Sequence, residues 1–132
     1  GVDMHFYKRV KEDGKGIFFL EDVEEQIDFI CAMGEGNEDE FVSKSLGDLD
    51  QAKSELEQMV GLWKSGDREG LNEHTNIAMK KEYPDLYKSL LVDRNNNWMP
   101  LIQTLFDSEE KEFVLVGAAH LVGEEGLLTQ LE

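Results

Sequence analysis

Apolar residues recur every three or four positions along most of the chain, the spacing that gathers side chains on one face of an α-helix. The pattern is clearest between residues 38 and 65. Glycine-containing turns, such as 34–37 and 66–67, separate the helical stretches. The spacing therefore predicts helices over residues 3–11, 22–33, 38–65, 68–81, 84–91 and 93–106, and a last helix that begins near residue 124.

Two short apolar runs interrupt the helical pattern. The runs cover residues 16–20 and 113–116, and short continuous apolar segments of this kind are typical of buried strands. The predicted fold is a mostly helical α/β domain with two short strands and about five to seven helices. Two strands do not form a stable sheet on their own. The pattern therefore indicates an incomplete α/β domain, whose sheet other sequence or another chain completes, or else a fold that helices dominate.

Composition and net charge limit the classes of partner that the chain can bind. The chain has 132 residues, enough for one domain with a core, and its 29 acidic and 13 basic side chains give a net charge of −16. This balance argues against binding to nucleic acid or to an anionic membrane surface, since both need clustered Lys and Arg. We expect no membrane insertion, because no apolar run reaches the roughly 18 residues of a spanning helix. The lone Cys31 excludes an internal disulfide.

Polar residues end both predicted strands. Glu21 follows the first run, and His120 lies four residues after the second. If the strands are parallel, both side chains emerge at the carboxyl edge of the sheet, where α/β sheets bind ligands. The alternative interpretation makes Glu21 a cap for the following helix and His120 a loop residue.

Arg94 is a third unexpected polar residue. Its distance from Leu90 and Trp98, four residues on either side, places it on the apolar face of a continuous helix. A buried guanidinium needs a carboxylate or ligand partner. The alternative is a helix break at residues 95–97, which would free Arg94 to reach solvent or cap a helix end.

Glycines surround His120. Gly117 precedes it in a GxxH motif, where glycine allows a sharp turn and close approach of a ligand, while imidazole can bind a metal or transfer a proton near pH 7. Gly123 and Gly126 flank two glutamates that suit the start of a helix. A GxxH motif alone carries little specificity.

Several segments together resemble the TraB/GumN family, which includes the Tiki proteases and the pheromone-shutdown protein TraB. Residues 113–128, FVLVGAAHLVGEEGLL, look like the carboxyl-terminal signature of that family. Arg94-Asn95 resembles its RN segment, and Leu20-Glu21 with Glu25-Gln26 resembles its LE…EQ segment. The order and spacing of these segments match along nearly the whole chain.

The resemblance implies a metal-dependent, hydrolase-like scaffold, with peptidase activity among the Tiki members. Family members carry two GxxH motifs accompanied by a glutamate and an arginine. Here His120 matches the second histidine, Glu21 the glutamate and Arg94 the arginine, with Glu21 and His120 as ligands of a divalent metal. The first GxxH motif and the final strand have no counterpart in this sequence. We therefore expect residues 1–132 to form a single partial domain of this type.

The expected function is that of part of a peptidase-like hydrolase, with little or no activity by itself. The alternative is a non-catalytic module that binds a peptide or protein on the same scaffold. Unpaired strand edges recruit other chains, so we also expect a homodimer or a domain swap. Many family members are exported, which implies an extracytoplasmic location.

Overall fold

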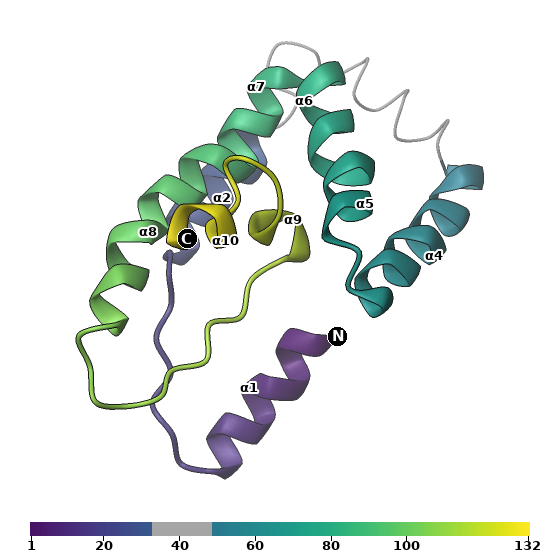
Figure 1. Cartoon of the computed structure of the whole chain (residues 1–132). Helices are drawn as coiled ribbons and strands as arrows, with labels where there is room; N and C mark the ends of the chain where they lie inside the picture. The colour runs from purple at the N-terminus through teal and green to yellow at the C-terminus, as the bar shows by residue number, and fades with distance from the viewer. Residues whose placement is uncertain (33–48) are drawn as a thin grey trace.

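The computed structural model describes residues 1–32 and 49–132 (Figure 1). The first part of the described chain forms the helices α1 (Val2–Glu12), α2 (Val23–Ala32) and α4 (Leu49–Ser65). They agree with the helical spacing of the sequence. The part of the expected 38–65 helix that precedes residue 49 lies outside the described residues.

Two long helical segments follow. The first comprises α5 (Arg68–Asn72), a π-helical turn η1 (Glu73–Ile77) and α6 (Ala78–Glu82). The second comprises α7 (Pro84–Tyr87), a π-helical turn η2 (Lys88–Asp93) and α8 (Arg94–Leu105). Tyr83 leaves the helical region between them, with φ −138° and ψ 68°, and a proline in the first turn of α7 starts the second segment.

The second segment is one continuous helix rather than the two expected helices. The three asparagines at 95–97 lie inside α8, so the helix does not break there. Arg94 therefore stays on the same helical face as Leu90 and Trp98. This settles the choice that the spacing left open.

Short helices α9 (Ala118–Leu121) and α10 (Leu127–Leu131) lie between the two long segments (Figure 1). Helix α9 contacts α5, and α10 contacts α8. The core joins Trp98, Met99 and Ile102 of α8 to Leu127 of α10, with Leu20, Val116 and Leu121 packed against it. The carboxyl-terminal segment is thus held by the second long helix.

The two predicted strands are absent: no strand occurs in residues 1–32 or 49–132, and the described fold is mostly helical. Residues 15–19 and 111–117 have no regular secondary structure, and Phe18 is 94% exposed. The prediction of an α/β domain with two strands is therefore wrong for this structure. A strand is stable only when a neighbour pairs its backbone groups, and the described chain provides no such pairing here.

The described part of the chain contains no helix that combines the length and apolar character needed to cross a membrane.

Candidate functional site

Glu21 lies at the entry to α2, but it does not cap that helix. Asp22 does: its side chain accepts from the backbone N–H of Glu25 at 2.8 Å, and the Glu25 carboxylate accepts from the backbone N–H of Asp22 at 2.9 Å. This reciprocal arrangement is a capping box. It leaves the Glu21 carboxylate to make contacts elsewhere.

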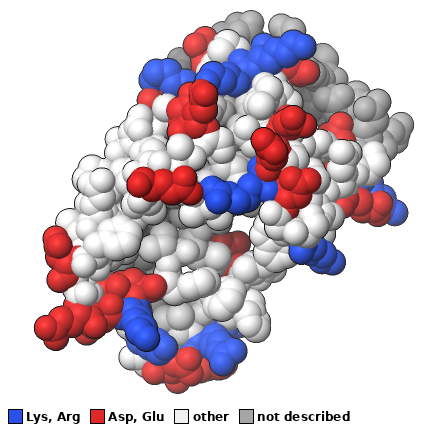
Figure 2. Space-filling view, in the orientation of Figure 1, with Lys and Arg blue, Asp and Glu red and all other residues white. Residues whose placement is uncertain are grey.

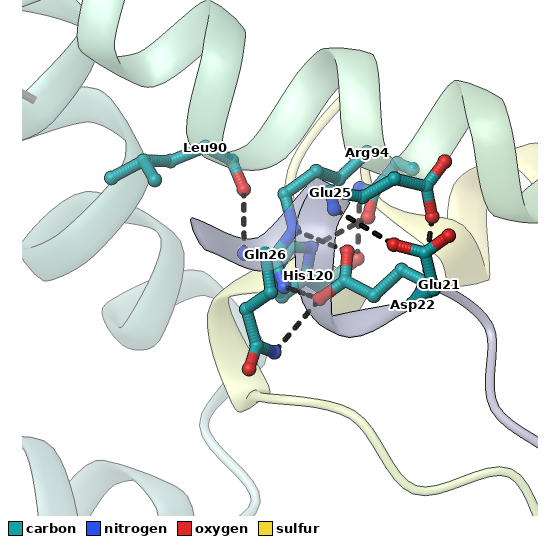
Figure 3. Close-up of polar contacts among 8 residues, drawn as sticks. Glu21, Asp22, Glu25, Gln26, Leu90, Arg94 and His120 are labelled. Atoms are coloured by element: carbon teal, nitrogen blue, oxygen red, sulfur yellow. Dashed lines mark hydrogen bonds and ion pairs between the residues drawn. The ribbon is translucent and has the colours of Figure 1, made fainter. Parts of the chain in front are cut away.

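Arg94 binds that carboxylate through two hydrogen bonds (Figure 3). Its Nε donates to Oε2 at 3.0 Å and its Nη2 donates to Oε1 at 2.6 Å. Gln26, one turn into α2, donates from Nε2 to Oε1 at 3.0 Å. Both side chains of the ion pair are largely buried, with 18% of Arg94 and 12% of Glu21 exposed. Paired bonds of this kind fix both the position and the orientation of the carboxylate.

The guanidinium of Arg94 also lies over the indole of Trp98, 4.9 Å from the ring centroid. The imidazole of His120 contacts the same indole, with 4.5 Å between ring centroids. Trp98 is one turn after Arg94 in α8 and is 4% exposed. The buried indole therefore links the Glu21–Arg94 pair to His120.

Two asparagines hold the segment that carries His120. From α8, Asn95 donates its amide N–H groups to the carbonyls of His120 at 3.1 Å and Glu125 at 2.8 Å. From η1, Asn76 donates to the carbonyls of Ala119 at 3.0 Å and Val122 at 2.8 Å. Each asparagine lies in or just after a π-helical turn, a feature that is frequent at functional sites.

Burial and charge set the protonation states. Burial raises the pKa of Glu21, but the hydrogen bonds from Arg94 and Gln26 and the charge of Arg94 outweigh this effect, so the pKa lies below its usual value. Burial and then the charge of Arg94 lower the pKa of His120 to about 4, against a smaller upward effect of Glu21. At neutral pH the site therefore holds a carboxylate, a guanidinium and a neutral imidazole.

The two motif glycines differ in what they require. Gly123 has φ +90°, and a Cβ there would press into the side-chain oxygen of Asn72, so this position needs glycine. Gly117 has φ −60° and ψ 142°, which any residue adopts, and a Cβ there would make only an ordinary contact with His120. The sharp turn expected at Gly117 is therefore not what the structure shows.

The donor chemistry of the site fits a divalent metal only in part. His120 offers an imidazole nitrogen, and Oε2 of Glu21 accepts one hydrogen bond, from Arg94, which leaves this oxygen a lone pair. Within residues 1–32 and 49–132, however, no group of three or more His, Cys, Asp or Glu side chains converges. A catalytic zinc ion usually has three protein ligands. The described residues thus supply two donors at most.

The contacts that organise the site could not be identified from the sequence. Asn95, Asn76 and Trp98 received no role, although a polar residue on an apolar helical face was the signal that singled out Arg94. A second anchor was also missed: the Glu125 carboxylate accepts from Lys80 and from the Tyr87 hydroxyl, both at 2.8 Å. The Lys80 hydrogen bond is the main cause of the lowered pKa of Glu125.

With this geometry in view, the comparisons with known proteins give the class of the chain. The model of the TraB/PrgY/gumN family matches residues 1–132, the whole sequence. The chain belongs to the TraB/PrgY/gumN family. No curated protein and no solved structure matches it.

Proposed function

We propose that this chain contributes part of the site of a metal-dependent, peptidase-like hydrolase, in which Glu21, Arg94 and His120 act together. The observation that supports this most directly is their convergence. Three segments far apart in sequence bring a carboxylate, its bidentate arginine and a neutral imidazole to the first turn of α8, around Trp98. Burial of polar groups costs free energy that hydrogen bonds must offset, and buried groups with shifted pKa values cluster at functional sites.

Each side chain has a separate role in the proposal. His120 and Glu21 would contribute ligands to a divalent metal, and such a metal, when bound, would activate a water for hydrolysis of a peptide bond. Arg94 is a positioning residue that orients the Glu21 carboxylate through two hydrogen bonds. Its positive charge also favours negative charge that develops on a substrate.

The same geometry supports the view that the described residues, 1–32 and 49–132, do not complete the site by themselves. Two donors are fewer than the three that catalytic metal sites in hydrolases usually have. The resemblance implies a further GxxH motif that would supply the missing histidine. We therefore expect the chain by itself to have little or no hydrolytic activity.

The test compares variants of the full-length protein that contains this chain. Metal-dependent cleavage of a peptide library is measured for the wild type, for His120→Ala and for His5→Ala, because His5 is an exposed histidine of α1. The expected result is loss of cleavage in His120→Ala alone. Equal rates in all three proteins would remove His120 from the mechanism.

A second candidate is a non-catalytic module that binds peptides. It is favoured by the three hydrogen bonds that the Glu21 carboxylate already accepts, two at Oε1 and one at Oε2, because they leave little of the carboxylate for a metal. The exposed aromatic residues Phe18 and Phe19 would provide apolar contacts for a partner. Tight peptide binding by a full-length protein that neither binds metal nor cleaves would support this function over hydrolysis.

A further inference from the structure

Among the buried polar residues that the structure describes, Asn95 has the lowest exposure, 2%, and the orientation of its amide follows from its neighbours. The nitrogen end faces two backbone carbonyls, those of His120 and Glu125. A carbonyl can only accept a hydrogen bond, so the atom that faces both must be the amide nitrogen. The oxygen Oδ1 therefore points the other way, toward the ring of His120.

That oxygen lies 2.8 Å from Nδ1 of His120. An amide oxygen can only accept, so Nδ1 must carry the hydrogen of this bond. The lone pair of the neutral ring then resides on Nε2. Within the described residues Nε2 makes no hydrogen bond, so its lone pair is the one that can bind a metal or accept a hydrogen.

We propose that Asn95 is a positioning residue that selects the Nδ1–H tautomer of His120, so that His120 binds its ligand through Nε2. The tautomer follows from the hydrogen bonds alone, whereas the identity of the ligand as a divalent metal rests on the proposed function. Histidines that bind metals commonly donate their other ring N–H to a neighbouring acceptor, which fixes the ring and its tautomer. A side-chain amide that also binds two carbonyls of the same segment holds ring and backbone as one unit.

Asn76 provides a matched control. It is also buried, with 4% exposed, and it also binds two carbonyls of the segment that carries His120. Its bonds go to the backbone of Ala119 and Val122, whereas Asn95 binds the ring. Loss of Asn76 therefore loosens the segment without removing the acceptor that selects the tautomer.

The experiment reads the tautomer directly by long-range ¹H–¹⁵N correlation spectroscopy at pH 7 in metal-free protein. The whole chain carries His5→Gln and His74→Gln, so that His120 alone gives a signal. We expect a protonated Nδ1 and an unprotonated Nε2 in this background and in Asn76→Ala. In Asn95→Leu we expect a mixture of both tautomers.

A second variant covers the case in which Asn95→Leu does not fold. Asn95→Asp keeps an acceptor oxygen beside Nδ1 but loses the two bonds to carbonyls, so the Nδ1–H form should persist. An Nε2–H form in the unsubstituted background, or in Asn95→Asp, would overturn the inference. So would an unchanged Nδ1–H form in a folded Asn95→Leu chain.

Addition of Zn²⁺ separates this inference from the proposed function. The Nε2 signal should shift on binding, and Asn95→Leu should weaken the affinity roughly 10- to 100-fold, more than Asn76→Ala does. Zn²⁺ that leaves the Nε2 signal unchanged, with the Nδ1–H tautomer intact, would count against metal binding and leave the role of Asn95 standing. Zn²⁺ that shifts Nδ1 instead would overturn the role of Asn95.

Discussion

Among the single residues of the site, Arg94 contacts both Glu21 and Trp98. It binds Glu21, 73 positions away, through two hydrogen bonds, and it covers the indole of Trp98 on its own helix. A guanidinium keeps its charge at any ordinary pH, so a largely buried arginine depends on its carboxylate. The stability of the chain and the geometry of the site therefore rest on the same ion pair.

Removal of Glu21 should destabilise the chain more than removal of both partners. Glu21→Leu leaves Arg94 largely buried without its carboxylate and should cost roughly 3 kcal/mol in the free energy of unfolding. Glu21→Leu combined with Arg94→Met should cost less, because the buried guanidinium is removed together with its carboxylate. Urea unfolding followed by tryptophan fluorescence measures both.

The exposed ion pair between Lys53 and Glu57 provides a control for this comparison of variants. Its side chains are 85% and 71% exposed, so Glu57→Gln should change stability by less than about 0.5 kcal/mol. A double variant that is as unstable as Glu21→Leu alone, or less stable, would contradict the dependence of Arg94 on Glu21.

His120 should make the chain lose stability as the pH falls. Its pKa is lowered to about 4 in the folded chain, so between pH 6.5 and 4 the unfolded chain binds more protons and the free energy of unfolding rises with pH. This contribution is fully present above pH 6.5 and is lost as the pH falls toward 4, with a slope of at most about 1.4 kcal/mol per pH unit. Urea unfolding at pH 7, 6 and 5 measures the slope.

Two variants assign that slope. His120→Gln should flatten the dependence between pH 7 and 5, even if it lowers stability overall, while His5→Gln, at an exposed position, should keep it. An equal slope in all three chains would show that His120 is not the group that titrates.

The site also depends on how its elements are joined. The His120 segment runs from α9 to α10 and is held by side chains of η1 and α8. Gly123 lies within it at φ +90°, against the side chain of Asn72. Unlike Gly117, this glycine is required by both its backbone conformation and its lack of space.

Alanine should have opposite effects at two glycines. Gly123→Ala should destabilise the chain by roughly 1–3 kcal/mol, from the strained backbone and the clash with Asn72. Gly61→Ala, in the interior of α4 with open space around it, should stabilise the chain by roughly 0.5–1 kcal/mol. Thermal unfolding of both variants gives the comparison, and a harmless Gly123→Ala would contradict the tight packing of this segment.

On the scale of the whole molecule, net charge and exposed apolar residues have opposite effects on self-association. Figure 2 shows acidic and basic side chains interleaved over one face, while a broad area of that face carries neither. The net charge of −16 repels a second copy. Phe18 and Phe19, 94% and 75% exposed, instead favour association.

Self-association remains a prediction, although the strand edges expected to drive it are absent from the described residues, and it should depend on salt. Screening of the negative charge should shift the chain from monomer toward dimer as ionic strength rises. Phe18→Lys with Phe19→Thr should abolish the dimer, while Leu56→Lys, at an exposed position of α4, should leave it. Sedimentation velocity over a range of concentrations measures this, and a monomer under every condition would count against the prediction.

The helices and the types of residue in the site could be predicted because their signals are local. Helical periodicity spans a few residues, and a charged residue such as Arg94 on an apolar helical face signals a buried partner within one turn of sequence. The structure of residues 16–20 and 113–116 could not be predicted correctly. An apolar run has the composition of a strand, but it forms a strand only beside a segment that pairs with its backbone.

The partners within the site depended on packing of segments that the sequence keeps apart. Glu21 and Arg94 are 73 residues apart, and His120 and Asn95 are 25 apart, so no spacing rule connects them. Because Asp22 caps α2, the Glu21 carboxylate is available to bind Arg94. Because α8 is continuous through Asn95, Asn95 lies on the helix where it can contact His120. Local sequence patterns were enough to identify Glu21, Arg94 and His120 as candidate site residues. Their partners were decided only by the tertiary structure, because a polar group is buried at low cost in free energy only where another segment provides a hydrogen bond.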